Sequence, residues 1–305
     1  MSTFAPVSLS DGAIVPGLGF GVGTAHFGGD SPELVQTIKT ALEVGFRHLD
    51  GAEAYKNEES LGKAIAESGI PRDELYVTTK SGPGLKDIPA SFDQSLKKLG
   101  LSHVDLYLIH WPYDFPKPGY PTIEEAWKAL EAIKDSGRAK SIGVSNFRVR
   151  DLEKILAIPD LKHKPACNQI EFHPFMYEAG EELFQYCKKH DIAIEAYGPT
   201  SPAFRFDGNR GNFDAVLEEV SKAVAQRAGK DKVEPSQVLL RLAAQRGAIV
   251  ITTSGKDWRM KECVSLCLFA LSCLTQDEID ELVKAAKPAP QRAFMKHMDD
   301  KDTEY

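Results

Sequence analysis

The feature that most constrains the fold is a regular alternation of short apolar segments with longer amphipathic segments along the chain. The short segments have the length and composition of buried strands, and the longer ones carry apolar residues at helical spacing. We identify eight such strand–helix units, and neither a linker nor a change of composition separates them. This pattern favours an α/β fold of the closed (β/α)8 TIM barrel type over an open doubly wound sheet.

The alternation predicts an element order for residues 1–305, which we expect to form a single barrel domain. The predicted strands are 18–21, 46–50, 75–80, 104–110, 139–145, 166–169, 192–197 and 248–252. The predicted helices are 31–44, 58–68, 88–99, 122–136, 149–158, 178–190, 213–228, 235–246 and 276–286, so extra C-terminal helices are expected. Residues 7–15 predict a short N-terminal β-hairpin that turns at Asp11 and Gly12.

Several binding classes are disfavoured by charge and by missing motifs. The net charge of −7 argues against a nucleic-acid partner, which requires a basic face. Residues 17–23 are rich in glycine but lack a strict G-x-G-x-x-G, and Walker A, H-E-x-x-H and G-x-S-x-G motifs are absent. The chain shows neither a leader nor an apolar run of membrane-spanning length, so we expect a cytoplasmic protein with no membrane partner. The five cysteines form no C-x-x-C pair, and reduced thiols are expected.

In a barrel of this type, chemistry occurs just beyond the carboxyl ends of the strands, which converge on one face. The predicted strand ends carry many groups that donate or accept protons and contain no three-ligand metal set, so no metal is expected. These residues are Asp50, Lys80, His110, Ser145, Asn146, Gln169, Glu171, Tyr197, Thr252, Thr253 and Ser254.

Asp50, Tyr55, Lys80 and His110 fit one scheme of acid catalysis. Tyr55 follows Asp50 by five residues, in a turn of small residues that can leave the phenol open to a cavity. An isolated phenol has a pKa of about 10, and Lys80 beside it would lower that pKa by favouring the phenolate. Asp50 would keep the lysine charged, and His110 would hydrogen-bond the substrate oxygen. Taken alone, His110 has the alternative interpretation of a core histidine bonded to a backbone carbonyl.

The same residues resemble those of the aldo-keto reductases over nearly the whole chain. The matching segments are 45–61, 77–80, 104–112, 142–147, 168–174 and 195–197. The resemblance implies a catalytic tetrad of Asp50, Tyr55, Lys80 and His110 that reduces carbonyls with a nicotinamide hydride. It also implies that Ser145, Asn146 and Gln169 bind the nicotinamide carboxamide, that Tyr197 stacks on the ring, and that Thr24, Pro199 and Ser201 contact the cofactor.

By the same resemblance, residues 251–259 occupy the place where the family binds the adenosine 2′-phosphate. The usual pattern there is Lys-Ser-Asn with a later Arg. Here Thr253 replaces the Lys, Gly255 replaces the Asn, and Cys263 stands where an Asn is usual. Ser254 and Arg259 remain, and Lys256 restores a cation, so these residues with Thr253 are assigned to the cofactor and NADPH is predicted.

The pattern of residues 252–256 is most similar to a fungal branch with conjugated polyketone reductases and α-keto amide reductases. That branch implies small-molecule carbonyl substrates of the activated kind: vicinal dicarbonyls, isatin-like compounds and ketopantoyl lactone. His26, Phe27, Trp111 and Tyr113 follow the first and fourth strands and are expected to contact the substrate. The polar tail after Lys287 shows no aromatic lid and predicts an open pocket. Residues 200–212 would fold over the cofactor or form a mobile surface loop.

Two other functions remain open at this point. Lys80 could form a Schiff base, as in a barrel aldolase, although a lysine paired with Asp50 is a poor nucleophile. The barrel could also act as a nicotinamide-binding sensor or accessory subunit, but no added interaction segment is visible. On the resemblance alone we expect a monomer.

Overall fold

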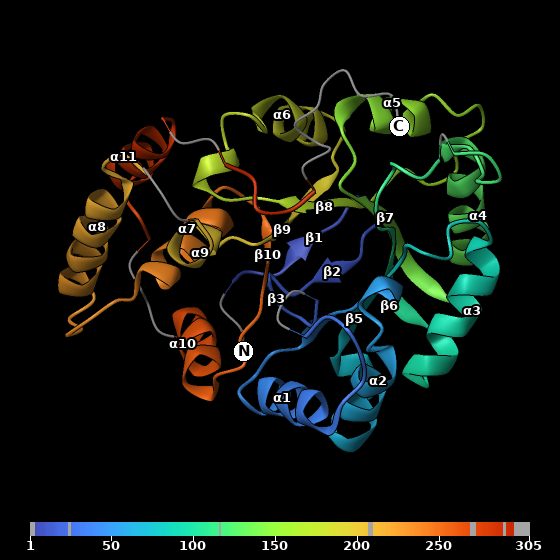
Figure 1. Cartoon of the computed structure of the whole chain (residues 1–305), viewed down its shortest axis with the longest axis horizontal. Coiled ribbons are helices and arrows are strands. Elements are labelled where there is room, and N and C mark those ends of the chain that lie inside the picture. Colours follow the sequence, from blue (N-terminus) through green and yellow to red (C-terminus); the bar gives the residue numbers. More distant parts are fainter. Residues whose placement is uncertain are drawn as a thin grey trace.

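The structure is a computed structural model that describes residues 4–23, 26–115, 117–206, 210–268, 273–288 and 291–295, with side chains 265–268 left out. Parallel strands close into a barrel in the order β10-β3-β4-β5-β6-β7-β8-β9, as predicted (Figure 1). The strands are β3 (Leu18–Gly21), β4 (His48–Asp50), β5 (Tyr76–Ser81), β6 (Val104–Ile109), β7 (Ala139–Ser145), β8 (Cys167–Glu171), β9 (Ala193–Tyr197) and β10 (Ile249–Thr252).

The predicted helices are all present, with bounds close to those expected from the sequence. They are α1 (Pro32–Glu43), α2 (Glu58–Glu67), α3 (Ile88–Leu99), α4 (Ile123–Asp135), α5 (Val149–Leu156), α6 (Glu181–Lys189), α8 (Phe213–Arg227), α9 (Pro235–Gln245) and α11 (Gln276–Ala286). Side-chain caps stabilise the starts of several of these helices. Ser31 Oγ accepts a hydrogen bond from Leu34 N at the start of α1, and Thr122 and Glu125 form a capping box at the start of α4.

Two helices and three short 3-10 turns were not predicted. The helix α10 (Asp257–Leu268) follows the last strand, and its apolar and polar residues are mixed around the helix rather than separated on two faces, so its sequence lacks the usual signal. The helix α7 (Ser201–Phe204) is a single turn. The 3-10 turns are η1 (Glu53–Tyr55), η2 (Arg72–Glu74) and η3 (Pro174–Met176).

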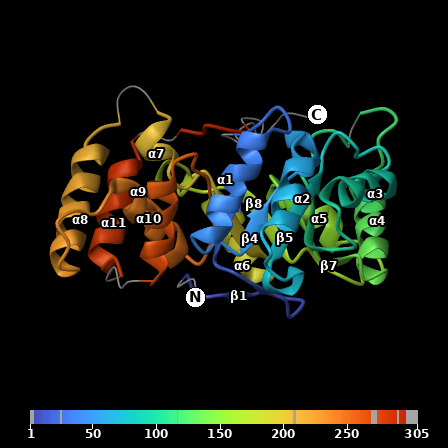
Figure 2. The same cartoon turned by 90° about the horizontal axis from the view of Figure 1, so that it is seen from below.

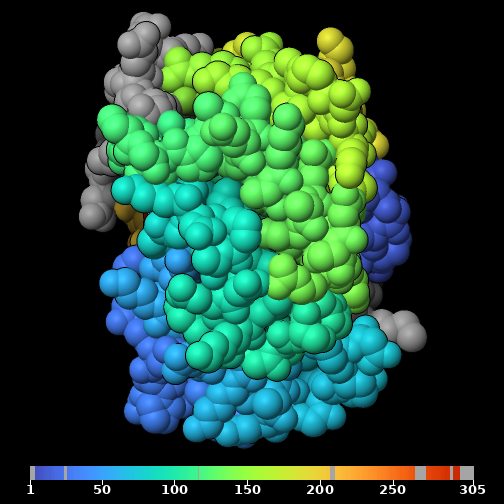
Figure 3. All heavy atoms as spheres, turned by 90° about the vertical axis from the view of Figure 1, so that its right-hand side faces the viewer, coloured from blue at the N-terminus to red at the C-terminus, as the bar shows by residue number. Residues whose placement is uncertain are grey.

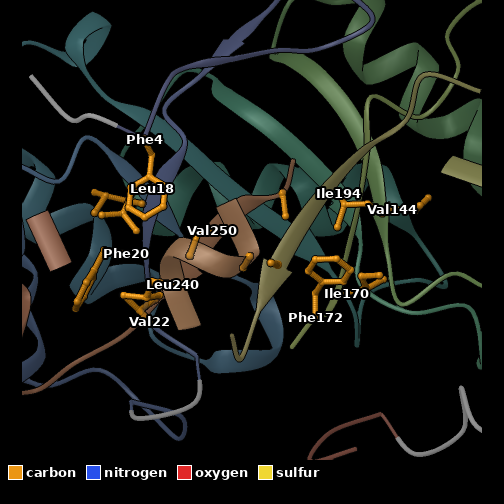
Figure 4. Packing of buried hydrophobic residues seen from close by; sticks show 14 of the residues in the cluster. Phe4, Leu18, Phe20, Val22, Val144, Ile170, Phe172, Ile194, Leu240 and Val250 are labelled. Carbon is orange, nitrogen blue, oxygen red and sulfur yellow. The ribbon is translucent and has the colours of Figure 1, made fainter. Parts of the chain in front are cut away.

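Strand residues alternate between two apolar cores, because successive side chains point to opposite faces of a strand. Leu18, Phe20 and Val22 form a row that faces the surrounding helices (Figure 4). The smaller core lies inside the barrel and includes Leu106 and Ile251. Seen from the side of α3 and α4, the surface passes from blue through green to yellow, so successive segments of the chain lie side by side around the barrel (Figure 3).

Within the glycine-rich run of residues 17–23, Gly19 and Gly23 lie at close approaches between neighbouring segments. A Cβ at Gly19 would lie 2.7 Å from Ile251 Cδ1 and 2.9 Å from His48 Nδ1, inside the barrel. A Cβ at Gly23 would lie 2.7 Å from Tyr55 Cζ. At Gly19 and Gly23, glycine is therefore required by the close approach of side chains from neighbouring strands and from the site.

The predicted N-terminal hairpin forms from β1 (Val7–Ser8) and β2 (Ile14–Val15), which pair antiparallel. It lies at one end of the barrel, and α7 lies at the other (Figure 2). Leu9 and Val15 of this segment belong to the inner core and close that end. The opposite end of the barrel, where the strands have their carboxyl ends, is therefore where we look for the site. Among the described helices, none has the length and apolar character needed to cross a membrane.

Candidate active site

Three of the four predicted catalytic residues meet directly at the carboxyl ends of the strands. Lys80, on β5, is fully buried, and its Nζ donates to Asp50 Oδ1 at 2.7 Å and to the Gly51 carbonyl at 2.9 Å. Its third contact is Tyr55 Oη, 3.4 Å away. Asp50 ends β4, and the 3-10 turn η1 returns the chain so that Tyr55 lies above the lysine. The ammonium therefore joins the carboxylate to the phenol.

The protonation states follow from burial and from these contacts. Burial lowers the pKa of Lys80, but Asp50 and Tyr55 outweigh it, so the pKa lies above its ordinary value and the lysine is an ammonium. Removal from water raises the pKa of Tyr55, Lys80 lowers it and Asp50 raises it, and the net direction is upward. The effect of Lys80 has the predicted sign, but the prediction of a lowered phenol pKa is wrong, because burial of the phenol outweighs the cation.

His110 follows β6 and faces the tyrosine. The two rings lie 5.5 Å apart at an angle of 80°. Burial, with a smaller effect of Lys80, holds the pKa of His110 well below its ordinary value, so the imidazole is neutral and carries one N–H. Within the described part of the chain, His110 Nδ1 is buried and has no hydrogen-bond partner. Tyr55 and His110 are thus two neutral polar groups directed at one space.

That space is a cavity of about 970 Å3, within the range expected of a ligand site. Its lining includes Asp50, Tyr55 and His110, whereas Lys80 lies behind them. The described residues predicted to bind the cofactor also line it: Ser145, Asn146, Gln169, Tyr197, Pro199, Ser201, Thr253, Ser254, Lys256 and Arg259. Thr24, the remaining predicted cofactor residue, lies outside the described residues.

Near the tetrad, the predicted carboxamide site is a connected hydrogen-bond network. Asn146 has a left-handed backbone, with φ of 60°, which asparagine tolerates better than most residues. Its Nδ2 donates to the His110 carbonyl at 2.9 Å, and its Oδ1 accepts from the Tyr197 hydroxyl at 2.8 Å. Ser145 Oγ donates to the backbone carbonyl of Gln169 at 2.8 Å. The network holds an amide, a hydroxyl and a phenol ring in place beside the tetrad.

Farther along the same cavity lies the predicted phosphate pocket. Ser254 Oγ accepts from the backbone N–H of Lys256 at 3.0 Å, in the turn between β10 and α10. The Arg259 guanidinium lies 5.0 Å from the ring of Phe204 and 5.0 Å from that of Trp258, a cation–π geometry. The cavity thus joins two cations at one end to an amide-lined end beside the tetrad.

The predicted substrate residues do not all face this cavity. Phe27, Trp111 and Tyr113 line it, whereas His26 is not among the described lining residues. Trp111 and Tyr113 are stacked, with ring centroids 5.1 Å apart at 10°. Trp111 Nε1 also donates to Asp114 Oδ2 at 2.6 Å. The loop after β6 therefore forms an ordered aromatic wall.

The prediction of a tail without an aromatic lid is wrong. Phe294 and Met295 line the cavity, and the Phe294 ring lies 5.7 Å from that of Tyr197. The buried carboxylate of Glu171, at the end of β8, accepts from Ala293 N at 2.7 Å and from Phe294 N at 3.0 Å. The red C-terminal segment accordingly crosses the barrel end near β8 (Figure 1). The sequence marks Glu171 only as a strand-end residue, and no local signal indicates its contact with the tail.

Comparisons with known proteins identify the family of the chain. A model of the Aldo/keto reductase family matches residues 20–286. The NAD/NADP-dependent indole-3-acetaldehyde reductase of Schizosaccharomyces pombe is 40% identical over 293 residues, which cover 95% of this chain and 98% of that protein. The NADPH-dependent alpha-keto amide reductase of Saccharomyces cerevisiae is 36% identical over 289 residues, covering 90% and 89%. The crystal structure of an aldo/keto reductase from Brucella melitensis matches with a TM-score of 0.76 at 37% identity, covering 92% of this chain and 98% of that one.

Proposed function

The chain belongs to the aldo/keto reductase family, and from this premise we propose that it is an NADPH-dependent carbonyl reductase for activated ketones. The observation that carries the proposal is the chain of contacts from Asp50 through Lys80 to Tyr55, with neutral His110 beside it at the cavity. When a carbonyl carbon accepts a hydride, its oxygen needs a proton, and this group of four residues can provide one.

Each residue has a distinct part in that proton transfer. Tyr55 has a raised pKa, so it is protonated at neutral pH and donates its proton to the carbonyl oxygen. Lys80 stabilises the phenolate that forms, and Asp50 keeps Lys80 charged. His110, as a neutral imidazole, hydrogen-bonds the same oxygen and orients it. The bound nicotinamide cofactor supplies the hydride.

NADPH is favoured over NADH by the cations at the far end of the cavity. Lys256 and Arg259 both line it, and a neutral ribose diol would not require two cations there. At the near end, Ser145, Asn146 and Gln169 would hold the carboxamide, and Tyr197 would stack on the ring. One relative is named as NAD/NADP-dependent and another as NADPH-dependent, so the preference has to be measured.

The proposed substrates are ketones made electrophilic by a second carbonyl. Stacked Trp111 and Tyr113 with Phe294 form flat apolar walls around the space in front of Tyr55. Such walls suit a planar dicarbonyl such as isatin or a compact one such as ketopantoyl lactone. An adjacent carbonyl withdraws electrons and eases hydride addition, so few polar substrate contacts are required. The Saccharomyces relative is named for α-keto amides, a class with the same adjacent carbonyl.

The test follows NADPH and NADH oxidation at 340 nm with isatin and with ketopantoyl lactone. We expect consumption of NADPH by the wild type and a loss of at least about 100-fold for Tyr55→Phe, the size of a general-acid contribution. Tyr186→Phe is the matched control, because Tyr186 lies on α6 and is not among the residues lining the cavity. Equal use of NADH would refute the cofactor preference. Binding of both cofactors without turnover of any carbonyl would refute the reductase and favour a sensor.

A further inference from the structure

Glu195 is a fully buried carboxylate next to the tetrad, and the mechanism above does not use it. It lies on β9 directly opposite Gln169 of β8, and both side chains point into the barrel. Its Oε2 accepts a hydrogen bond from Gln169 Nε2 at 2.8 Å. Its Oε1 is buried without a hydrogen-bond partner among the described residues. A buried carboxylate with an unpaired oxygen costs stability, which points to a role other than packing.

The hydrogen bonds of Gln169 show what that role is. An amide nitrogen has two hydrogens, and Gln169 Nε2 donates one to Asp50 Oδ2 at 2.8 Å and one to Glu195 Oε2 at 2.8 Å. Ionised carboxylates only accept hydrogen bonds, so a rotated amide would place its Oε1 against two negative groups. The last torsion of a glutamine side chain is otherwise broad. The two carboxylates therefore fix which end of the amide faces them.

We propose that Glu195 is a positioning residue that, with Asp50, locks the Gln169 amide so that Oε1 accepts the carboxamide N–H of the nicotinamide. The inference rests on the proposed function, since it names the group that Gln169 binds. Gln169 lines the cavity, and Oε1 is its remaining side-chain polar atom. Without Glu195, Asp50 Oδ2 would hold one hydrogen of the Gln169 amide nitrogen, and the other hydrogen would lose its acceptor. Asp50 Oδ1 already accepts from Lys80.

The charged and titratable groups around Glu195 set the conditions for a test. Asp50, Lys80, Tyr76 and Cys167 face it from β4, β5 and β8. Burial, and then Asp50, raise the pKa of Glu195 to about 7. Binding is therefore measured at pH 8, where most of the carboxyl is ionised.

The experiment measures cofactor dissociation constants by calorimetry, without turnover, for the wild type, Glu195→Leu, Gln169→Leu and the double variant. One lost hydrogen bond corresponds to about five- to tenfold weaker NADPH binding, which is the effect expected of Glu195→Leu. Glu195→Gln keeps an acceptor oxygen but can also turn its N–H groups toward Gln169, so it should keep only part of the lock and bind NADPH more weakly than the wild type. It replaces Glu195→Leu if the leucine variant fails to fold, and wild-type affinity for NADPH would then overturn the inference. The double variant should bind no more weakly than Gln169→Leu alone.

The probe that separates positioning from general disturbance is the 3-acetylpyridine analogue of the cofactor, whose methyl ketone replaces the carboxamide. It has no N–H for Gln169, so Glu195→Leu should leave its binding unchanged. Equal weakening of NADPH and the analogue, full additivity with Gln169→Leu, or unchanged NADPH binding in Glu195→Leu would each overturn the inference. NADPH binding by the wild type is measured before any variant, because its absence would refute the proposed function itself rather than the role of Glu195.

Discussion

The buried pair of Lys80 and Asp50 gives a prediction about stability that can be separated from catalysis. Lys80→Met should lower the free energy of unfolding by about 3–5 kcal/mol, because it leaves a buried carboxylate without its cation. The side chains are 0% and 3% exposed and the contact is 2.7 Å, so water cannot replace the lost partner.

The size of the effect follows from the geometry of the pair. Two unit charges 2.7 Å apart attract by about 6 kcal/mol at an effective dielectric constant of about 20, before desolvation is subtracted. Asp50→Asn should cost about as much as Lys80→Met, because it leaves the ammonium unpaired. The double variant removes both charges and should lie within about 2 kcal/mol of the wild type. The singles would then be far from additive.

The assay is urea unfolding followed by circular dichroism at pH 7, with enzymatic activity measured in parallel. All three variants should be inactive, so activity does not separate them, whereas stability does. Lys222→Met is the matched control, because Lys222 pairs with Glu218 at 2.7 Å on the surface, where 72% and 65% of the side chains are exposed, and its loss should change stability little. A double variant as unstable as the sum of the singles would refute the reasoning.

Three further predictions concern residues around the site. Burial and Asp50 raise the pKa of Glu195 from 4.5 to about 7, so its protonation favours the folded state below about pH 4.5 and that contribution is lost as the pH rises through 7. Relative to Glu195→Gln, the wild type should therefore lose about 3 kcal/mol between pH 4.5 and 8 in urea unfolding, and a pH-independent difference would contradict this. Gly23→Ala places a Cβ 2.7 Å from Tyr55 Cζ and should lower kcat/KM about 100-fold by displacing the phenol, with wild-type kinetics as the contrary result. Glu171→Gln weakens an acceptor of the Phe294 N–H and should raise the substrate KM a few-fold while NADPH binding is kept; a change in NADPH binding alone would show that the tail serves the cofactor instead.

The order of strands and helices was predictable because each element carries its own local pattern. The helices α1 and α4 directly follow Ser31 and Thr122, whose side chains accept hydrogen bonds from free N–H groups of the first turn. The helix α10 was missed because its apolar residues do not gather on one face. It forms nevertheless, after β10 and beside the other helices of the barrel, which shows that tertiary contacts override a weak local pattern.

Residue type and strand position were enough to bring Asp50, Lys80 and His110 to one face, because all strands of a parallel barrel end there. Three-dimensional contacts decided what those groups do. The net pKa of Tyr55 depends on how much water reaches the phenol, which no spacing in the sequence reveals. Phe294 enters the site because Glu171, far away in the chain, accepts two backbone N–H groups of the tail. Sequence alone determined the order of strands and helices, which arises from local periodicity, and the types of residue that stand at the strand ends. Burial, charge balance and the placement of the tail arise from contacts between distant segments, and only the tertiary structure decided them.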